Sequence, residues 1–142
     1  MTVLDAYALV AYLRGEAAAN DVATLLRTSA RLPAANAAEV VDQMVRVFGR
    51  DADDVHADLA LLANAGMTIA PIDADLALLA GRLRARHYHR ERMAVSLADC
   101  VAAATALSER RSLATADPAL AELVRREGGK VHGLPDSTGR LP

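Results

Sequence analysis

The chain has 142 residues, of which 53% are hydrophobic and 24% are charged, and its net charge is −2. This length and composition fit one folded domain and exclude a disordered chain, and the small net charge gives no overall field that would favour nucleic acid. No apolar run approaches the ~20 residues that span a bilayer, no signal peptide is visible, and the single Cys100 cannot form an internal disulfide, so we expect a cytoplasmic protein with no membrane segment.

Short apolar runs alternate with longer segments of helical period. In chain order, the pattern predicts a strand at 2–4, a helix ending at 14, a helix at 16–27, a strand at 31–34, helices at 37–48 and 51–65, a strand at 67–71, a helix after 73, a helix at 96–108, a strand at 112–115, a helix at 118–126 and a strand at 131–134. This alternation predicts the α/β class, with a parallel sheet covered on both faces. We expect a single domain over 1–142, with its core at about 2–134 and a loose tail at 135–142. Ligands in such sheets bind at the carboxyl edge, where the strands lead into helices.

Four acidic residues fall within the first turn of an expected helix, and three of these helices directly follow a strand: Asp5, Glu39, Asp99 and Asp117. Each is explained separately as a helix cap, because carboxylates accept hydrogen bonds from first-turn N–H groups. Asn36-x-x-Glu39 and Ser96-x-x-Asp99 resemble capping boxes, and Asp117 precedes a proline at a helix start.

The four acids together suggest a second function. If their turns meet at one sheet edge, carboxylates ~5 Å apart repel by roughly 3 kcal/mol per pair at an effective dielectric of ~20. No Lys or Arg adjoins any of the four in sequence. Protonation or a divalent cation would relieve the repulsion, and an all-oxygen ligand set suits Mg²⁺ or Mn²⁺ rather than Zn²⁺. An acidic Mg²⁺ site in turn fits phosphoryl chemistry.

The motifs Val3-Leu4-Asp5-Ala6, Glu39, Ser96-Leu97-Ala98-Asp99 and Thr115-Ala116-Asp117 resemble those of PIN domains, most closely VapC-type toxins. The resemblance covers residues 2 to about 134. It implies an α/β/α sandwich with a central parallel sheet of four to five strands. It also implies a metal-dependent endoribonuclease that uses Mg²⁺ or Mn²⁺, an RNA substrate, an antitoxin encoded beside it, and a homodimer.

Carried onto this sequence, the resemblance implies that Asp5, Asp99 and Asp117 hold one or two metal ions. Glu39 would bind a second metal or orient the attacking water, and hydrolysis would leave a 5′-phosphate and a 3′-hydroxyl. Thr115, Asn36 and Ser96 are supporting residues, with a structural role favoured over a catalytic one. Tyr7 departs from the small polar residue usual at its position, and it is expected in the core or stacked on a base.

Two further features suggest contacts with partners. Five arginines lie between 82 and 92, and Arg86, Arg90 and Arg92 are candidates for RNA contact, although a solvated helix face explains them equally. The apolar helices between 16 and 65 exceed what one face of a small sheet requires. They would form a groove for an antitoxin helix, a homodimer face, or ordinary core.

Two other functions remain open for this pattern. A receiver-type signalling domain is also α/β with an acidic pocket, but it needs paired acids early and a Lys after the fifth strand. Here Asp5 stands alone, and the only lysine, Lys130, precedes the last strand. A catalytically silent PIN-like binding module would retain the same fold with the acids acting only as caps.

Overall fold

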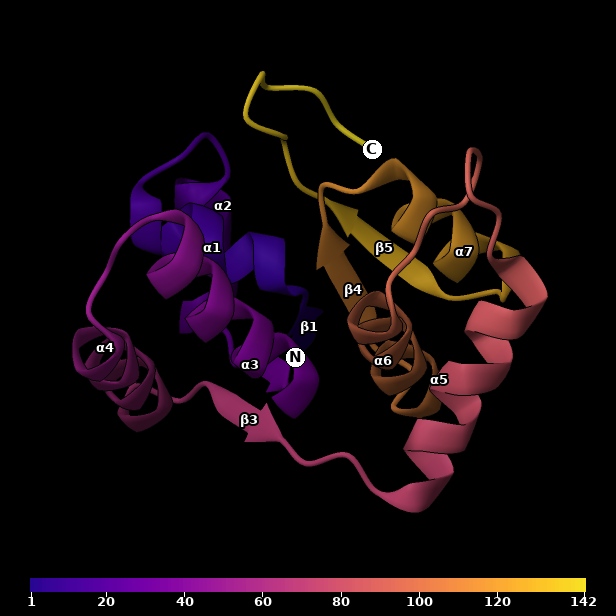
Figure 1. The fold of residues 1–142 in the computed structure, drawn as a ribbon, viewed down its shortest axis with the longest axis horizontal. Coiled ribbons are helices and arrows are strands. Elements are labelled where there is room, and N and C mark those ends of the chain that lie inside the picture. Colours follow the sequence, from indigo (N-terminus) through magenta and orange to yellow (C-terminus); the bar gives the residue numbers. More distant parts are fainter.

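The computed structural model describes all 142 residues and contains five strands and seven α-helices (Figure 1). The strands are β1 (Thr2–Leu4), β2 (Ala30–Pro33), β3 (Thr68–Ala70), β4 (Ser112–Thr115) and β5 (Lys130–Gly133). The helices are α1 (Ala6–Arg14), α2 (Ala19–Arg27), α3 (Ala34–Asp42), α4 (Ala52–Asn64), α5 (Ala74–His87), α6 (Leu97–Ser108) and α7 (Pro118–Arg126). A short π-helical segment, Gln43–Val47, continues α3.

All five strands are parallel and lie in the order β3-β2-β1-β4-β5. In the central pairs, Val3 lies opposite Arg31 on β2 and Leu113 on β4. The order differs from the 2-1-3-4-5 arrangement of receiver domains, so the receiver interpretation is wrong for this fold.

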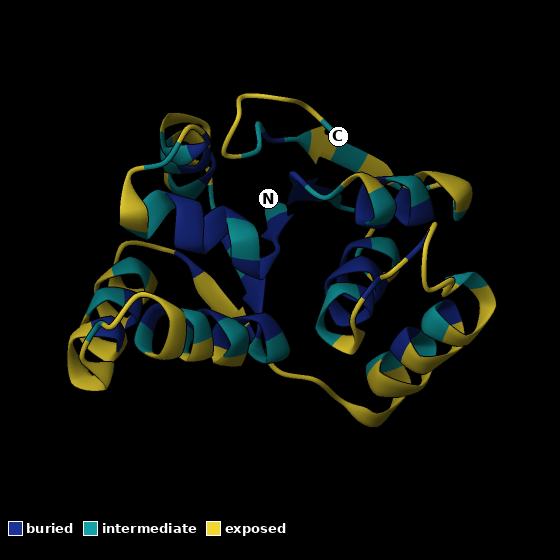
Figure 2. Cartoon of the chain, turned by 45° about the horizontal axis from the view of Figure 1, so that its top comes forward, coloured by how far each residue is buried: buried dark blue, intermediate teal, exposed yellow.

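Side chains of the central strands alternate between two hydrophobic clusters, as the period of a β-strand requires. Leu4 and Ala114 belong to a cluster of 20 buried residues that extends over α1 to α4. Val3 and Leu113 belong to a second cluster of 15 buried residues that extends over α5 to α7. The helices therefore form two groups on either side of the sheet, as Figure 1 shows, and the most buried residues lie between them (Figure 2). The predicted covered parallel sheet is confirmed, with five strands.

The strand predictions agree with the structure to within a few residues, but two helices begin elsewhere. The helix expected at 16–27 begins at Ala19, after a turn that buries Ala18 completely. The helix expected at 37–48 begins at Ala34, directly after β2, and becomes π-helical from Gln43. Pro33 supplies the extended residue from which α3 starts, with φ −62° and ψ 147°.

The segment after β5 folds back over the sheet edge. The Tyr7 hydroxyl donates to the Pro135 carbonyl at 3.1 Å, and the Asp136 carboxylate accepts from the backbone N–H groups of Thr138 and Arg140. Tyr7 is half-buried and packs against the first hydrophobic cluster, and Cys100 is fully buried, as expected for a small apolar residue. None of the helices is both long and apolar enough to cross a membrane.

Candidate acidic site

Asp5 lies at the carboxyl end of the central strand β1 and is only 3% exposed. Its Oδ1 accepts the Ala8 N–H at 2.8 Å, which caps α1. The pKa of Asp5 is raised from 3.8 to about 7, with burial as the largest cause and the charges of Asp99 and Asp117 as smaller ones. Hydrogen bonds from Thr115 and Ala8 oppose this rise in the pKa but do not cancel it. The carboxyl group is thus held where its ionised form is poorly stabilised by the protein alone.

Asp99 enters the site from the first turn of α6. The predicted capping box is confirmed: the Ser96 N–H donates to Asp99 Oδ2 at 2.7 Å, and the Asp99 N–H donates to Ser96 Oγ at 3.0 Å. Burial, assisted by the charge of Asp117, raises the pKa of Asp99, although both bonds to Ser96 lower it. Ser96 therefore fixes the orientation of the Asp99 carboxylate, which is a structural role.

Asp117 caps α7, and its Oδ1 accepts the Ala119 N–H at 2.8 Å. Thr115, at the end of β4, is fully buried and joins two of the acids. Its hydroxyl oxygen accepts the Asp117 N–H at 3.0 Å, and its hydrogen bond with the Asp5 carboxyl lowers the pKa of Asp5. Thr115 thus links the turn after β1 to the turn after β4 through hydrogen bonds.

The turn of α3 that carries Glu39 differs from the sequence prediction. The proposed capping box of Asn36 and Glu39 is wrong, because α3 begins two residues before Asn36 and has no side-chain cap. Glu39 Oε1 instead accepts a hydrogen bond from Gln43 Nε2 at 3.2 Å. Gln43 was not among the residues expected from sequence, although its spacing of four residues from Glu39 on one helix was a usable signal.

Three buried polar atoms in this turn of α3 have no hydrogen-bond partner in the protein. They are both amide atoms of the fully buried Asn36 and Oε2 of Glu39. Buried polar groups are almost always paired with protein or with bound water. This turn therefore retains unused capacity to bind water or an ion beside the acids.

The four carboxyl groups influence one another electrostatically but do not form a closed cage. Burial raises the pKa of Glu39 first and the charge of Asp99 second, and Asp99 also acts on Asp5. No three acidic, histidine or cysteine side chains are arranged to hold a metal ion as they stand. One oxygen each of Asp5, Asp99 and Asp117 accepts a backbone hydrogen bond at a helix start.

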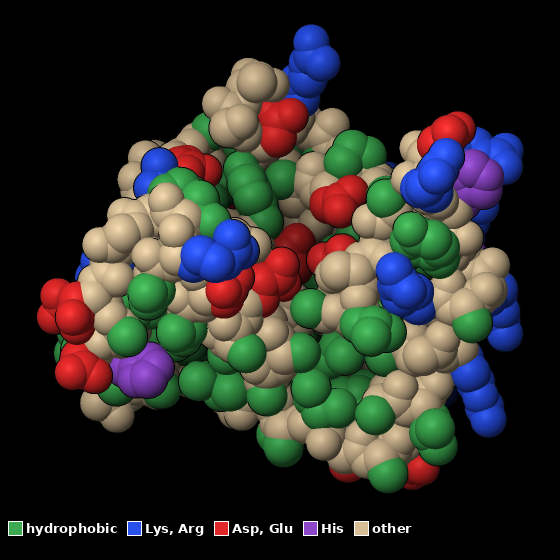
Figure 3. Space-filling view, viewed as in Figure 1, with side chains coloured by type: hydrophobic (Ala, Val, Ile, Leu, Met, Phe, Trp, Pro, Cys, Tyr) green, Lys and Arg blue, Asp and Glu red, His purple; other side chains and the backbone are tan.

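The donor set nevertheless fits a divalent cation. It consists of oxygen atoms, several of the acids have raised pKa values, and the buried Glu39 Oε2 lacks a partner. A hard cation such as Mg²⁺ or Mn²⁺ matches such ligands and would favour the ionised carboxylates. Figure 3 shows acidic side chains gathered in a depression near the middle of one face of the molecule. The charge of Asp99 acts on the pKa values of Asp5 and Glu39, and the charge of Asp117 acts on those of Asp5 and Asp99.

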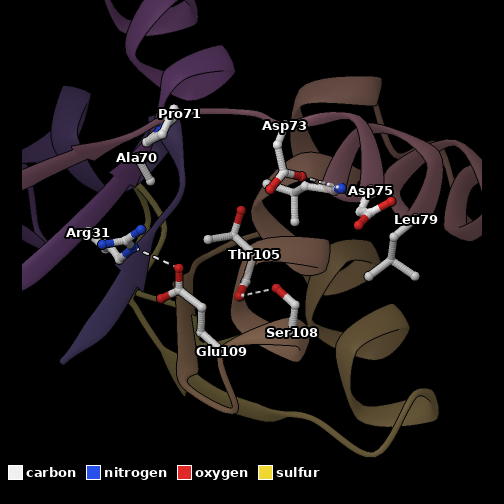
Figure 4. A pocket seen from close by; sticks show the side chains of 10 residues that line it. Arg31, Ala70, Pro71, Asp73, Asp75, Leu79, Thr105, Ser108 and Glu109 are labelled. Atoms are coloured by element: carbon white, nitrogen blue, oxygen red, sulfur yellow. Dashed lines mark hydrogen bonds and ion pairs between the residues drawn. The ribbon is translucent and has the colours of Figure 1, made fainter.

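A separate hollow of about 310 Å³ lies between the β2–β3 edge, the start of α5 and the end of α6 (Figure 4). Several of its polar groups already have partners: Arg31 forms an ion pair with Glu109 at 2.8 Å, Asp73 caps α5, and Ser108 donates to the Thr105 carbonyl at 3.2 Å. None of the four acids lines this hollow.

The predicted RNA-contact arginines lie outside the acidic cluster. Arg86 is in the last turn of α5, and Arg90 and Arg92 are in a short hairpin closed by backbone bonds between His89 and Met93. In Figure 3, basic side chains and a histidine gather at one corner of the face that carries the acidic depression. These arginines thus lie at the end of α5 and in the hairpin that follows it, outside the turns that carry the four acids.

The fold and the site together define a class of protein. It is a single α/β domain with acidic side chains where the strands of a parallel sheet lead into helices. The family model described as "PIN domain" matches residues 2–125, and the chain belongs to the PIN domain family. No curated protein sequence matches the chain significantly.

Several solved structures share the fold. The chain is similar to VapBC2 from Rickettsia felis bound to a promoter DNA fragment, with 15% identity, a TM-score of 0.67, and coverage of 92% of this chain and 96% of that one. It is similar to FitAcB from Neisseria gonorrhoeae, with 21% identity, a TM-score of 0.66, and coverage of 92% and 96%. It is also similar to VapC20 of Mycobacterium tuberculosis, a toxin that cleaves the sarcin-ricin loop, with 16% identity, a TM-score of 0.67, and coverage of 86% and 94%.

Proposed function

We propose that this protein is a Mg²⁺- or Mn²⁺-dependent endoribonuclease and the toxin component of a toxin–antitoxin pair. The observation that carries the proposal is the group of acids with raised pKa values at the carboxyl edge of the sheet, in a PIN domain. Membership of this family and the likeness to structures of toxin–antitoxin proteins support it. In a cell, RNA and antitoxin would be encountered in the cytoplasm.

Each of the four acidic side chains would have its own role in the cleavage reaction. Asp5, Asp99 and Asp117 would hold the cation through the carboxylate oxygens not used in capping, and Glu39 would orient the attacking water through its unpartnered Oε2. When bound, the cation would activate water and stabilise the leaving oxygen. Attack on phosphorus would break the bond to the 3′-oxygen, leaving a 5′-phosphate and a 3′-hydroxyl. Thr115 would keep Asp5 and Asp117 in place.

Cleavage of total RNA with and without Mg²⁺ or Mn²⁺ tests this proposal. The variant carrying Asp5→Asn and Asp99→Asn should lose metal-dependent cleavage. A matched control carries Asp51→Asn and Asp73→Asn, which alters two helix-capping aspartates outside the site. Equal cleavage by both variants would refute the assignment of the acids. Sequencing the fragment ends would identify the RNA that is cut.

We also propose that the apolar surface between α1 and α4 contacts the antitoxin. Tyr12, Leu13, Leu61 and Leu62 line a hollow of about 410 Å³ there, and Leu61 is 67% exposed. An amphipathic antitoxin helix would bury this surface, with a homodimer as the other occupant to be tested. Coexpression with the product of the adjacent reading frame should give a complex that Leu61→Glu disrupts. Leu78→Glu, at a similarly exposed position on α5, is the control.

A catalytically silent binding module remains the second candidate, because each acid also acts as a helix cap or as a hydrogen-bond partner within its helix. Well-folded protein that binds Mn²⁺ but cleaves no RNA would favour it.

A further inference from the structure

A second hollow, of about 340 Å³, lies between the end of α5, the hairpin that follows it and the end of α7. Its walls contain no acidic residue. They comprise three arginines, two histidines and two further residues: Arg86, Arg92, Arg126, His87, His89, Tyr88 and Met93. A surface of this composition favours an anionic ligand.

The arginines of the hollow are only partly neutralised. Arg86 donates to Glu127 through Nη1 at 3.0 Å, and Arg126 forms an ion pair with Glu122 through Nε at 2.7 Å. Each guanidinium retains further N–H donors, because the group carries five. Arg92 is exposed and has no ion pair, so its charge is available in full.

His89, which lines the hollow, belongs to the hairpin. His89 Nδ1 accepts hydrogen bonds from the backbone N–H groups of Glu91 and Arg92, both at 3.2 Å. An Nδ1 that accepts carries no proton, so the proton of the neutral ring resides on Nε2, which is then a donor. The turn of the hairpin thus fixes the tautomer of His89.

The hollow lies near Asp99 along the chain. Arg84 donates from Nε to the Val95 carbonyl at 3.0 Å, which ties the segment after the hairpin to α5. Met93, in the wall of the hollow, lies six positions before Asp99, so the connecting chain spans at most roughly 20 Å. One nucleic-acid strand of a few nucleotides bridges such a distance.

We propose that this hollow, bounded by Arg86, Arg92, His89 and Arg126, binds a backbone phosphate of the RNA strand whose scissile bond lies at the acidic site. The inference rests on the proposed ribonuclease function. In this proposal the hollow increases the affinity for RNA and positions the strand, and it takes no part in the cleavage reaction. Phosphate contacts position a nucleic acid without reading its sequence, so the hollow serves any single-stranded RNA.

The test measures binding rather than cleavage, in the Asp5→Asn background that the proposed function makes inactive. The probe is a fluorescein-labelled 12-nucleotide uridine RNA, titrated by anisotropy at salt concentrations from about 50 to about 200 mM. The test variant carries Arg86→Gln and Arg92→Gln. The control variant carries Arg27→Gln and Arg140→Gln, which removes the same charge at two exposed sites outside the hollow. Thermal denaturation verifies that both variants are folded.

We expect the test variant to bind roughly tenfold more weakly at 50 mM salt, and its log–log salt slope to fall by ~0.7 for each RNA phosphate that the variant no longer neutralises. The control should match the parent. Equal slopes for all three proteins, or an equal weakening in the control, would overturn the proposal, as would a parent that does not bind the probe. If the wild type cleaves RNA but the salt slope of the test variant equals that of the parent, only the proposal about the hollow is rejected. If the test variant binds the probe more weakly but the wild type does not cleave RNA, only the proposed ribonuclease function is rejected.

Discussion

Replacing Asp5 by Asn should stabilise the metal-free protein at neutral and alkaline pH. Asp5 is 3% exposed, and its pKa is raised to about 7, chiefly by burial. Asparagine has nearly the same shape and keeps an Oδ1 that can accept the Ala8 N–H, so the cap of α1 is preserved. The substitution therefore removes the ionisation and little else.

The magnitude follows from the pKa of Asp5 in the folded and unfolded states. The folded value of about 7 lies above the ordinary value of 3.8, so the native state binds the proton more tightly than the unfolded chain does. The stabilisation from this proton is complete below pH ~4, is lost as the pH rises toward about 7, and stays absent above it. The difference between the two pKa values corresponds to about 4 kcal/mol.

Urea denaturation of both proteins in EDTA, followed by circular dichroism between about pH 4 and pH 8, measures this effect. The two free energies of unfolding should agree near pH 4 and diverge to about 4 kcal/mol in favour of the variant near pH 8. A constant difference across the pH range would refute the reasoning, because it would show that Asp5 has similar pKa values in the folded and unfolded states.

Three further outcomes are expected. Mg²⁺ should raise the melting temperature of the wild type more at pH 8 than at pH 6, since at pH 6 the cation must displace a proton from Asp5. Thermal denaturation with and without Mg²⁺ at both pH values measures this difference. Ser96→Ala should lower the free energy of unfolding by about 1 kcal/mol through loss of the capping box, and Ser96→Thr should restore most of it in urea titrations. Leu113→Ala should lower the free energy of unfolding by about 2–5 kcal/mol, because removal of this fully buried side chain of β4 leaves a cavity against α6 and α7. Leu78→Ala, at an exposed position, should lower it far less in the same titrations.

The α/β class, the parallel sheet and the positions of the strands could be predicted from sequence, because short apolar runs between amphipathic segments have few other solutions. The start of α3 could not. Periodicity reports the buried residues Ala37, Val40 and Met44, but Ala34 and Ala35 carry no pattern, and only the fold shows that the helix starts directly at Pro33.

The candidate acids and their helix caps could be proposed from sequence, but the other local bonding around them could not. Asp5, Asp99 and Asp117 were identified from their places after strands or at helix starts, and their caps formed as expected. The pairing of Glu39 with Gln43 and the burial of Asn36 depend on how α3 packs against α6, which involves contacts distant in sequence. The pairing of Arg86 and His87 with Glu127 likewise joins α5 to the end of α7, some forty residues further along the chain.

Whether the four acids act together as a metal site or separately as helix caps is tested most directly by titrating Mn²⁺ into five single variants. Four carry Asp5→Asn, Glu39→Gln, Asp99→Asn or Asp117→Asn, and the fifth carries Asp73→Asn, which alters a capping aspartate of α5 with the same hydrogen bond to a first-turn N–H. We expect the wild type and the Asp73 variant to bind Mn²⁺ equally, and each of the other four to bind it at least tenfold more weakly. Binding that is unaffected in those four variants, or that is absent from the wild type, would show that the three aspartates only cap their helices and that Glu39 serves only in its hydrogen bond with Gln43.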